Sequence, residues 1–194
     1  MKTNSIILAF AIGFFASDAI SQSTFRLENY NSFSGIDAPV LDAEGNRLAG
    51  VGYAVELWGG AASNSLSPTL DFNTGQRVFL AFGTGLSAGY FTSINPMTVY
   101  EVPSGQLAWL QVRAWNTSFG STYEQVSALG IGGYGESLLL HISGGNPNGA
   151  PPTSPNPLIG LESFSLRPVP EPAVWQLSLV GLGALLWFRR KGAG

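Results

Sequence analysis

Hydrophobic side chains in the middle of the chain alternate with polar or small ones over short stretches, as they do in half-buried β-strands. One such stretch begins at Val51 and continues to Trp58. A second covers residues 107–115, and one of its faces is entirely aliphatic. That aliphatic face consists of Ala108, Leu110, Val112 and Ala114. We expect both stretches to be strands, with the aliphatic face of the second in the core.

Other short runs rich in β-branched and aromatic residues are separated by Gly, Asn, Ser and Pro. They predict further strands at residues 39–41, 77–82, 90–93, 138–142 and 163–167. No long helical pattern lies between them. Strands of this length and spacing predict an all-β fold, an antiparallel β-sandwich of the jelly-roll or immunoglobulin-like (Ig-like) kind.

The first 21 residues have the pattern of an export signal. Lys2 precedes an apolar run over residues 6–16, which is as long as the hydrophobic region of a signal peptide and too short for an ordinary membrane span. Small residues then allow signal peptidase to cut after Ala19 or after Ser21. We therefore expect residues 1–21 to be a helical signal peptide.

A second apolar run occupies residues 173–188, which carry no charge. As a helix it would be about 24 Å long, slightly shorter than the hydrocarbon core of a bilayer. Trp175 and Trp187 lie near its two ends, where indole rings favour the membrane interface. The basic residues 189–191 that follow belong on the cytoplasmic side. This pattern predicts a single transmembrane helix at residues 173–188.

The tail resembles a known sorting signal. A Pro-Glu-Pro triplet, a short hydrophobic helix and an arginine cluster follow one another over residues 169–191, in the order and spacing of the PEP-CTERM sorting domain of Gram-negative bacteria. The corresponding residues are Pro170, Glu171, Pro172, Arg189 and Arg190. Ala173 is a minor departure, because many members have Ser at this position. Two prolines also keep the triplet extended and accessible to an enzyme.

This resemblance implies a route for the protein. An exosortase, the membrane enzyme that sorts such proteins, would recognise the Pro-Glu-Pro triplet, and the two arginines would stop translocation. The protein would be anchored transiently in the inner membrane and then reach the cell surface or the extracellular matrix. The usual setting of the family is exopolysaccharide and biofilm matrix production.

Residues 22–168 between the two signals are expected to form the sandwich body, with residues 169–194 as the sorting tail. The body has five arginines, no lysine and ten carboxylates, a net charge of −5 that argues against nucleic acid as a partner. Residues 144–157, rich in Gly, Asn and Pro, could be a domain-ending linker or a long loop. We favour the loop because the apolar residues after it need burial. These are Leu158, Ile159, Leu161, Phe164 and Leu166.

Residue types limit the chemistry. The chain has no cysteine, which excludes disulfides, cysteine-based zinc sites and thiol nucleophiles, and it has a single histidine, His141. Residues 85–89 match the nucleophile elbow G-x-S-x-G around Ser87, and Glu101, Glu124 and Glu136 precede His141. An elbow needs a helix directly after the serine, whereas strand-like residues follow here. Residues 130–135 match G-x-G-x-x-G, again without a following helix. We expect no catalytic residue and no cofactor, with a Ser87 hydrolase as a remote alternative.

Oxygen-bearing side chains at alternate positions form a weak calcium candidate. Asp42, Glu44 and Asn46 have this spacing, but the glycine and the distant glutamate of an EF-hand loop are missing. A hairpin turn uses the same residue types. We therefore expect a turn and no metal site at this position.

The second face of residues 107–115 is the most distinctive candidate site. It carries Trp109, Gln111, Arg113 and Trp115. Tryptophan rings stack on sugar rings, while Gln and Arg hydrogen-bond to hydroxyls or carboxylates, so the face could bind a glycan. The more ordinary interpretation is that the face packs under other parts of the fold, with Arg113 paired to an acid.

Together these features predict an exported, non-catalytic structural or interaction module associated with exopolysaccharide or biofilm. A lectin-like carbohydrate-binding module is the alternative. The expected partners are signal peptidase and exosortase as processing enzymes, the membrane before processing, and polysaccharide.

Overall fold

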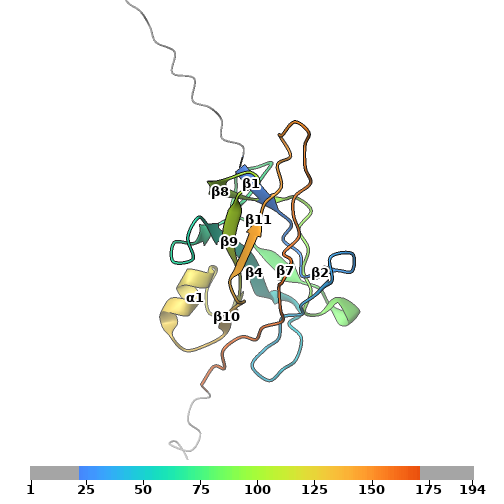
Figure 1. Ribbon diagram of the computed structural model, residues 1–194. Helices are drawn as coiled ribbons and strands as arrows, with labels where there is room; N and C mark the ends of the chain where they lie inside the picture. The colour runs from blue at the N-terminus through green and yellow to red at the C-terminus, as the bar shows by residue number, and fades with distance from the viewer. Residues whose placement is uncertain (1–21, 171–194) are drawn as a thin grey trace, which may run out of the picture.

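The two longest strands form the centre of a six-stranded antiparallel sheet (Figure 1). β4 (Gly50–Gly60) pairs with β9 (Leu107–Asn116) from Tyr53 opposite Asn116 to Gly60 opposite Trp109. The free edge of β9 pairs with two short strands, β10 (Tyr134–Glu136) and β11 (Leu140–Ser143). The free edge of β4 pairs with β5 (Ser67–Pro68) and β7 (Leu80–Phe82).

A second, three-stranded antiparallel sheet has the order β1-β8-β6. Its strands are β1 (Gln22–Phe25), β8 (Met97–Pro103) and β6 (Leu70–Asp71). A small hairpin of β2 (Tyr30–Asn31) and β3 (Ile36–Asp37) completes the strands of the computed structural model, which describes residues 22–170. The 3₁₀ turn η1 (Gly85–Ser87) and the helix α1 (Tyr123–Leu129) lie in the connections.

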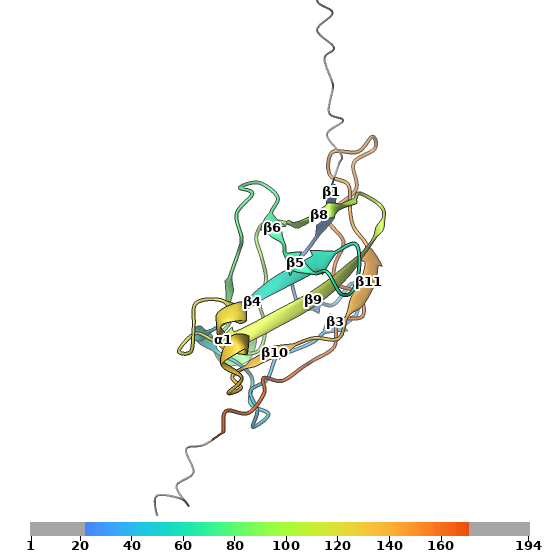
Figure 2. The ribbon, with the colours of Figure 1, turned by 90° about the vertical axis from the view of Figure 1, so that its left-hand side faces the viewer.

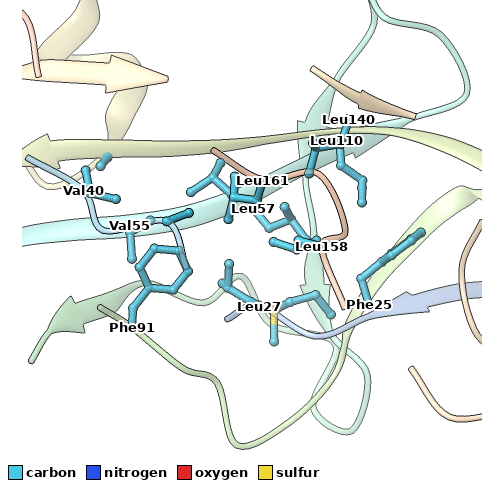
Figure 3. Close-up of a cluster of buried hydrophobic side chains, with 14 of the residues drawn as sticks. Phe25, Leu27, Val40, Val55, Leu57, Phe91, Leu110, Leu140, Leu158 and Leu161 are labelled. Carbon is cyan, nitrogen blue, oxygen red and sulfur yellow. The ribbon is translucent and has the colours of Figure 1, made fainter. Parts of the chain in front are cut away.

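Both sheets contribute side chains to one hydrophobic core (Figure 3). Phe25 and Val99 come from the smaller sheet, while Val55 and Leu57 come from β4. The aliphatic face of β9 is fully buried, with Ala108, Leu110, Val112 and Ala114 all at 0% exposure. The prediction that this face lies in the core is confirmed.

The predicted all-β, antiparallel character is confirmed. The segments at residues 39–41, 90–93 and 163–167 lie extended but form only isolated bridges, such as Leu41 to Ser165 and Glu28 to Thr92. Sequence analysis missed β1 and β8, in which buried residues follow one another without clean alternation. It also missed α1, whose N-cap Thr122 accepts a hydrogen bond from the Gln125 N–H.

Residues 144–157 return to the body. Gly145 exchanges two backbone hydrogen bonds with Thr24. The Asn156 N–H donates to the Thr24 carbonyl, and the Asn156 carbonyl accepts from the Arg26 N–H. Beyond them, Leu158, Leu161 and Leu166 are buried and Phe164 packs partly against the core, as a loop requires. The expected burial of Ile159 is wrong, since 57% of this residue is exposed.

The predicted signal peptide at residues 1–21 and the predicted transmembrane helix at residues 173–188 lie outside the described residues. Within residues 22–170, no helix has the length and apolar character needed to cross a membrane. Pro170, the first residue of the Pro-Glu-Pro triplet, is exposed at the end of this range, and Glu171, Pro172, Arg189 and Arg190 lie beyond it.

Candidate functional site on the outer face of the large sheet

The face of β9 that points away from the core carries the residues singled out from the sequence. Trp109, Gln111, Arg113 and Trp115 alternate with the buried aliphatic residues, so all four lie on this outer face. The register of β4 sets Gly60 beside Trp109, Trp58 beside Gln111, and Glu56 beside Arg113. On the other edge of β9, His141 lies beside Trp109 and Glu136 beside Arg113.

Helix α1 covers one end of the outer face (Figure 2). Tyr123 and Val126 of the helix pack on Ala54 and Trp115 to form a second hydrophobic cluster. Trp115 has 0% exposure, and its indole N–H donates to the Gly120 carbonyl at 3.2 Å. For Trp115 the structure matches the more ordinary interpretation, packing under other parts of the fold, because its ring lies under α1 and not on an open surface.

The opposite end of the outer face, away from α1, carries a stacked aromatic pair. The rings of Trp109 and His141 lie 4.2 Å apart between centroids and 12° from parallel. His141 is exposed and Trp109 is partly exposed. We call Trp109, Gln111, Arg113 and His141 the open end. His141 lies in β11, which matches the strand predicted at residues 138–142, but no local signal indicated its stacking on Trp109.

We call the part of the outer face that lies under α1, around Ala54 and Trp115, the covered end. Arg113 is the residue of the open end that lies nearest to it. Its guanidinium is 3.9 Å from the centroid of the Trp58 ring and 5.0 Å from that of Tyr123. Its Nε–H donates to Gln111 Oε1 at 2.9 Å, while Gln111 Nε2 donates to the Ser137 carbonyl at 3.1 Å. The Trp58 indole N–H is buried and has no acceptor within residues 22–170. Trp58 therefore contacts Arg113 through the face of its ring. Sequence analysis did not include Trp58 in the site.

Two carboxylates flank Arg113, and each binds another arginine instead. Glu56 is only 1% exposed and accepts from Nε and Nη2 of Arg77, each at 2.7 Å. Glu136 accepts from Nη2 of Arg167 at 2.6 Å. The expected pairing of Arg113 with an acid is therefore not found, since none of the ion pairs among residues 22–170 includes Arg113.

These pairs hold the charges of the covered end in place. Burial opposes the charge of Arg77, but its hydrogen bonds to Glu56 and Glu124 outweigh this and raise the pKa of Arg77. Partial burial would raise the pKa of Glu124, yet the hydrogen bond from Arg77 leaves that pKa below its ordinary value. Burial and the hydrogen bond to Glu136 raise the pKa of Tyr123 well above its usual range, so the phenol remains a donor. The covered end is thus a fixed network in which Arg77 is shared by Glu56 and Glu124, and Arg167 pairs with Glu136.

The open end has the chemical means to bind a sugar chain. Aromatic ring faces offer apolar contact to the C–H groups of a sugar ring, and a guanidinium and an amide beside them can hydrogen-bond to its oxygens. Trp109 and Arg113 are four residues apart, about 13 Å along the strand, which is more than one sugar ring covers. A sheet surface of this kind suits an extended polymer.

The structure does not bring Ser87 and His141 together. Ser87 lies in η1 and packs against Gly83, whose carbonyl accepts from the Gly50 N–H at the start of β4. His141 is in register with Trp109 and, through it, with Gly60 at the other end of β4. The length of β4 separates the two positions by about 30 Å.

The surroundings of Ser87 also differ from those of a nucleophile. A turn at residues 88–89 follows η1, where an elbow requires a helix. Ser87 lies on a groove of about 630 Å³ that is lined by Tyr30, Tyr90, Leu86 and other residues without a carboxylate or an imidazole. Of the other triad candidates, Glu124 and Glu136 bind Arg77 and Arg167, while Glu101 is exposed on β8 in the other sheet.

Asp42 organises a tight turn. Its Oδ1 accepts from the backbone N–H groups of Glu44 and Asn46 at 3.0 and 2.7 Å, and its Oδ2 accepts from the Asn46 side chain at 3.1 Å. These bonds occupy the carboxylate in closing the turn between Leu41 and Arg47. The geometry of Asp42, Glu44 and Asn46 is therefore that of the hairpin turn which the sequence suggested.

The glycine-rich residues 130–135 pack against the C-terminal segment of the body. Gly130 ends α1 in the left-handed conformation, with φ of 68°. A Cβ at Gly132 would lie 2.0 Å from the Pro168 carbonyl oxygen, and one at Gly135 would lie 2.5 Å from that of Ser165. The glycines thus allow residues 165–168 to lie directly against the chain, which explains the resemblance to a nucleotide-binding motif without a nucleotide.

Comparison of the chain with protein-family models, with curated proteins and with solved structures finds no match.

Proposed function

We propose that this protein is an exported, non-catalytic interaction module of the cell surface or the extracellular matrix. The stacked Trp109–His141 pair on the open end favours one form of this function, direct binding of polysaccharide in the manner of a lectin. This pair is the observation that carries the proposal, because two parallel rings at the surface, beside Gln111 and Arg113, offer both the apolar and the polar contacts of a sugar site.

The arrangement of the outer face supports binding of an extended chain. Helix α1 and the Glu56–Arg77 pair occupy the covered end, while the open end presents its side chains along β9 and β11. Ser87 and His141 lie beside opposite ends of β4, which argues against a Ser87 hydrolase, since a nucleophile and its base must be within hydrogen-bond reach. No cofactor is part of this proposal.

Affinity electrophoresis in gels that contain the host's own exopolysaccharide tests the sugar-binding function. The migration of the wild-type protein is expected to be retarded, and Trp109→Ala is expected to weaken binding by about tenfold or more, as loss of a central aromatic anchor does. Tyr100→Ala is the matched control, because Tyr100 is an exposed aromatic residue on β8 in the other sheet. Equal retardation of wild type and Trp109→Ala would exclude this face as the binding site.

We also propose that the protein is sorted through its tail. The apolar run at residues 6–16, the Pro-Glu-Pro triplet and the basic cluster after residues 173–188 support export, transient anchoring in the inner membrane and recognition by an exosortase. The body supports access to the triplet, because the Arg167 backbone is hydrogen-bonded to Gly133 and Tyr134 and Pro170 is exposed three residues later.

Deletion of residues 170–172 tests this part of the proposal. The intact mass of wild-type protein from its native host is expected to show loss of both the N-terminal signal and the tail. The deletion variant is expected to lose only the N-terminal signal and to remain in the membrane fraction. A deletion variant with the same processed mass and the same location as wild type would contradict sorting through the triplet.

At the level of the fold, we propose that the two sheets form a β-sandwich of the jelly-roll or Ig-like kind. The common core between the β1-β8-β6 sheet and the inner face of β4 and β9 supports this classification.

A further inference from the structure

Arg113 gives the open end a cation that no acid of the body neutralises directly. We propose that the polysaccharide bound at the open end is acidic and that its carboxylates pair with Arg113. This inference rests on the proposed sugar-binding function and specifies the class of sugar.

The guanidinium of Arg113 is held in a fixed position. Trp58 lies under it at 3.9 Å, Tyr123 lies at 5.0 Å, and Gln111 Oε1 accepts from its Nε–H. Stacking and one amide contact restrict the side chain without using its two terminal nitrogens, for which residues 22–170 supply no hydrogen-bond acceptor. With the Nε–H engaged, Nη1 and Nη2 together form one free edge, which matches a carboxylate in bidentate geometry.

The neighbouring carboxylates do not compete for Arg113. Glu56 is engaged by both Nε and Nη2 of Arg77, and Glu136 is engaged by Arg167 and by the Tyr123 hydroxyl. Each acid beside Arg113 is therefore turned toward another partner, which leaves the central guanidinium to an external anion. The register of the sheet produces this arrangement, because it sets an acid on each side of Arg113.

The net charge of −5 does not prevent an acidic chain from approaching this end. Asp42 and Glu44 lie in a separate turn and Glu101 lies on the other sheet, whereas Glu56 and Glu136 beside Arg113 are bound to Arg77 and Arg167. Charges more than about 8 Å away are largely screened at physiological ionic strength. A contact beside the Trp58 ring is screened less, so the local unpaired arginine determines the preference.

The position of Arg113 relative to the aromatic pair suits one polymer chain. Trp109 and Arg113 lie on the same face of one strand, separated by Gln111. A chain that stacks on Trp109 and runs along β9 would bring a carboxylate of a later sugar to Arg113. Trp109 would then supply affinity for any sugar chain, and Arg113 would supply the preference for an acidic one.

The test compares the host's exopolysaccharide with the same polymer after chemical reduction of its carboxyl groups to alcohols. Wild type is expected to bind the native polymer about tenfold more tightly than the reduced one, in line with a charge-assisted hydrogen bond. Arg113→Gln is expected to bind both polymers equally, at the level of wild type on the reduced polymer. Arg113→Lys, which retains the charge, is expected to keep part of the preference.

Controls separate this inference from the proposed function. Arg26→Gln removes an arginine that directly follows β1 of the smaller sheet and whose side chain is 56% exposed. This variant should leave the preference for the acidic polymer unchanged. Thermal unfolding checks that the Arg113 variants are folded. Equal binding of both polymers by wild type would overturn the acidic preference and leave sugar binding standing. Binding of neither polymer would overturn both.

Discussion

Replacing Glu56 with alanine is expected to lower the free energy of unfolding by about 3 kcal/mol, the lower end of the range for breaking a buried ion pair. Glu56 is only 1% exposed, and both of its oxygens accept from Arg77. Alanine at position 56 would leave the Arg77 side chain, which is 26% exposed, with Glu124 as its carboxylate partner. It would also leave a cavity in place of the buried Glu56 side chain. Denaturation with guanidinium chloride, followed by tryptophan fluorescence, measures the loss.

Two further variants identify the cause of this loss. Glu56→Gln keeps the volume and one acceptor, so we expect it to cost only about 1–2 kcal/mol. Glu101→Ala removes an exposed carboxylate from β8 and should change the stability by less than about 0.5 kcal/mol. A loss below about 1 kcal/mol for Glu56→Ala would mean that the pair with Arg77 does not support the sheet.

Replacing Gly132 with alanine is expected to destabilise the protein by about 3 kcal/mol and to detach the segment at residues 165–168. The new Cβ would lie 2.0 Å from the Pro168 carbonyl oxygen, and the φ of 88° is itself unfavourable for alanine. Arg167 donates its N–H to Tyr134 and accepts from Gly133, so the clash occurs at the point where this segment is bound. Hydrogen exchange of the Leu166 and Arg167 amides should rise together with the loss of stability.

Two glycines of the same glycine-rich segment serve as matched controls. Gly130 has a φ of 68° but free space around a new Cβ, so Gly130→Ala should show the backbone strain alone, about 1 kcal/mol. Gly135 has no positive φ, but its Cβ would lie 2.5 Å from the Ser165 carbonyl, so Gly135→Ala should show the clash alone, about 2 kcal/mol. If Gly132→Ala and Gly130→Ala cost the same, the close approach of the segment does not matter.

The strand pattern could be predicted because a residue's position on a strand determines which face it occupies. Alternation along residues 107–115 identified both faces of β9, and the aliphatic face lies in the core as expected. The segments at residues 39–41 and 163–167 were predicted as strands but form only single bridges. Extended backbone without a ladder of hydrogen bonds has the same residue types as a strand, so the sequence does not distinguish the two. α1 was missed because its seven residues are too short for a clear helical period.

The site could be predicted only in part, because it depends on how strands pair. Alternation put Trp109 and Trp115 on one face but could not show that α1 covers Trp115 and leaves Trp109 partly exposed. It could not see that β11 brings His141 beside Trp109, or that β4 brings Trp58 under Arg113. These contacts join residues 32 and 55 positions apart, and alternation within one strand contains no information about them.

The central claim is that the open end of the outer face binds a polysaccharide chain, and NMR of side-chain signals tests it most directly. During titration of ¹⁵N-labelled protein with oligosaccharides from the host's exopolysaccharide, the Trp109 indole N–H and the His141 ring signals are expected to shift. The Trp115 indole, buried under α1 and hydrogen-bonded to Gly120, is expected to stay in place. The claim is contradicted if Trp109 and His141 do not shift while the protein binds, or if the shifts gather at the Tyr30–Tyr90 groove instead.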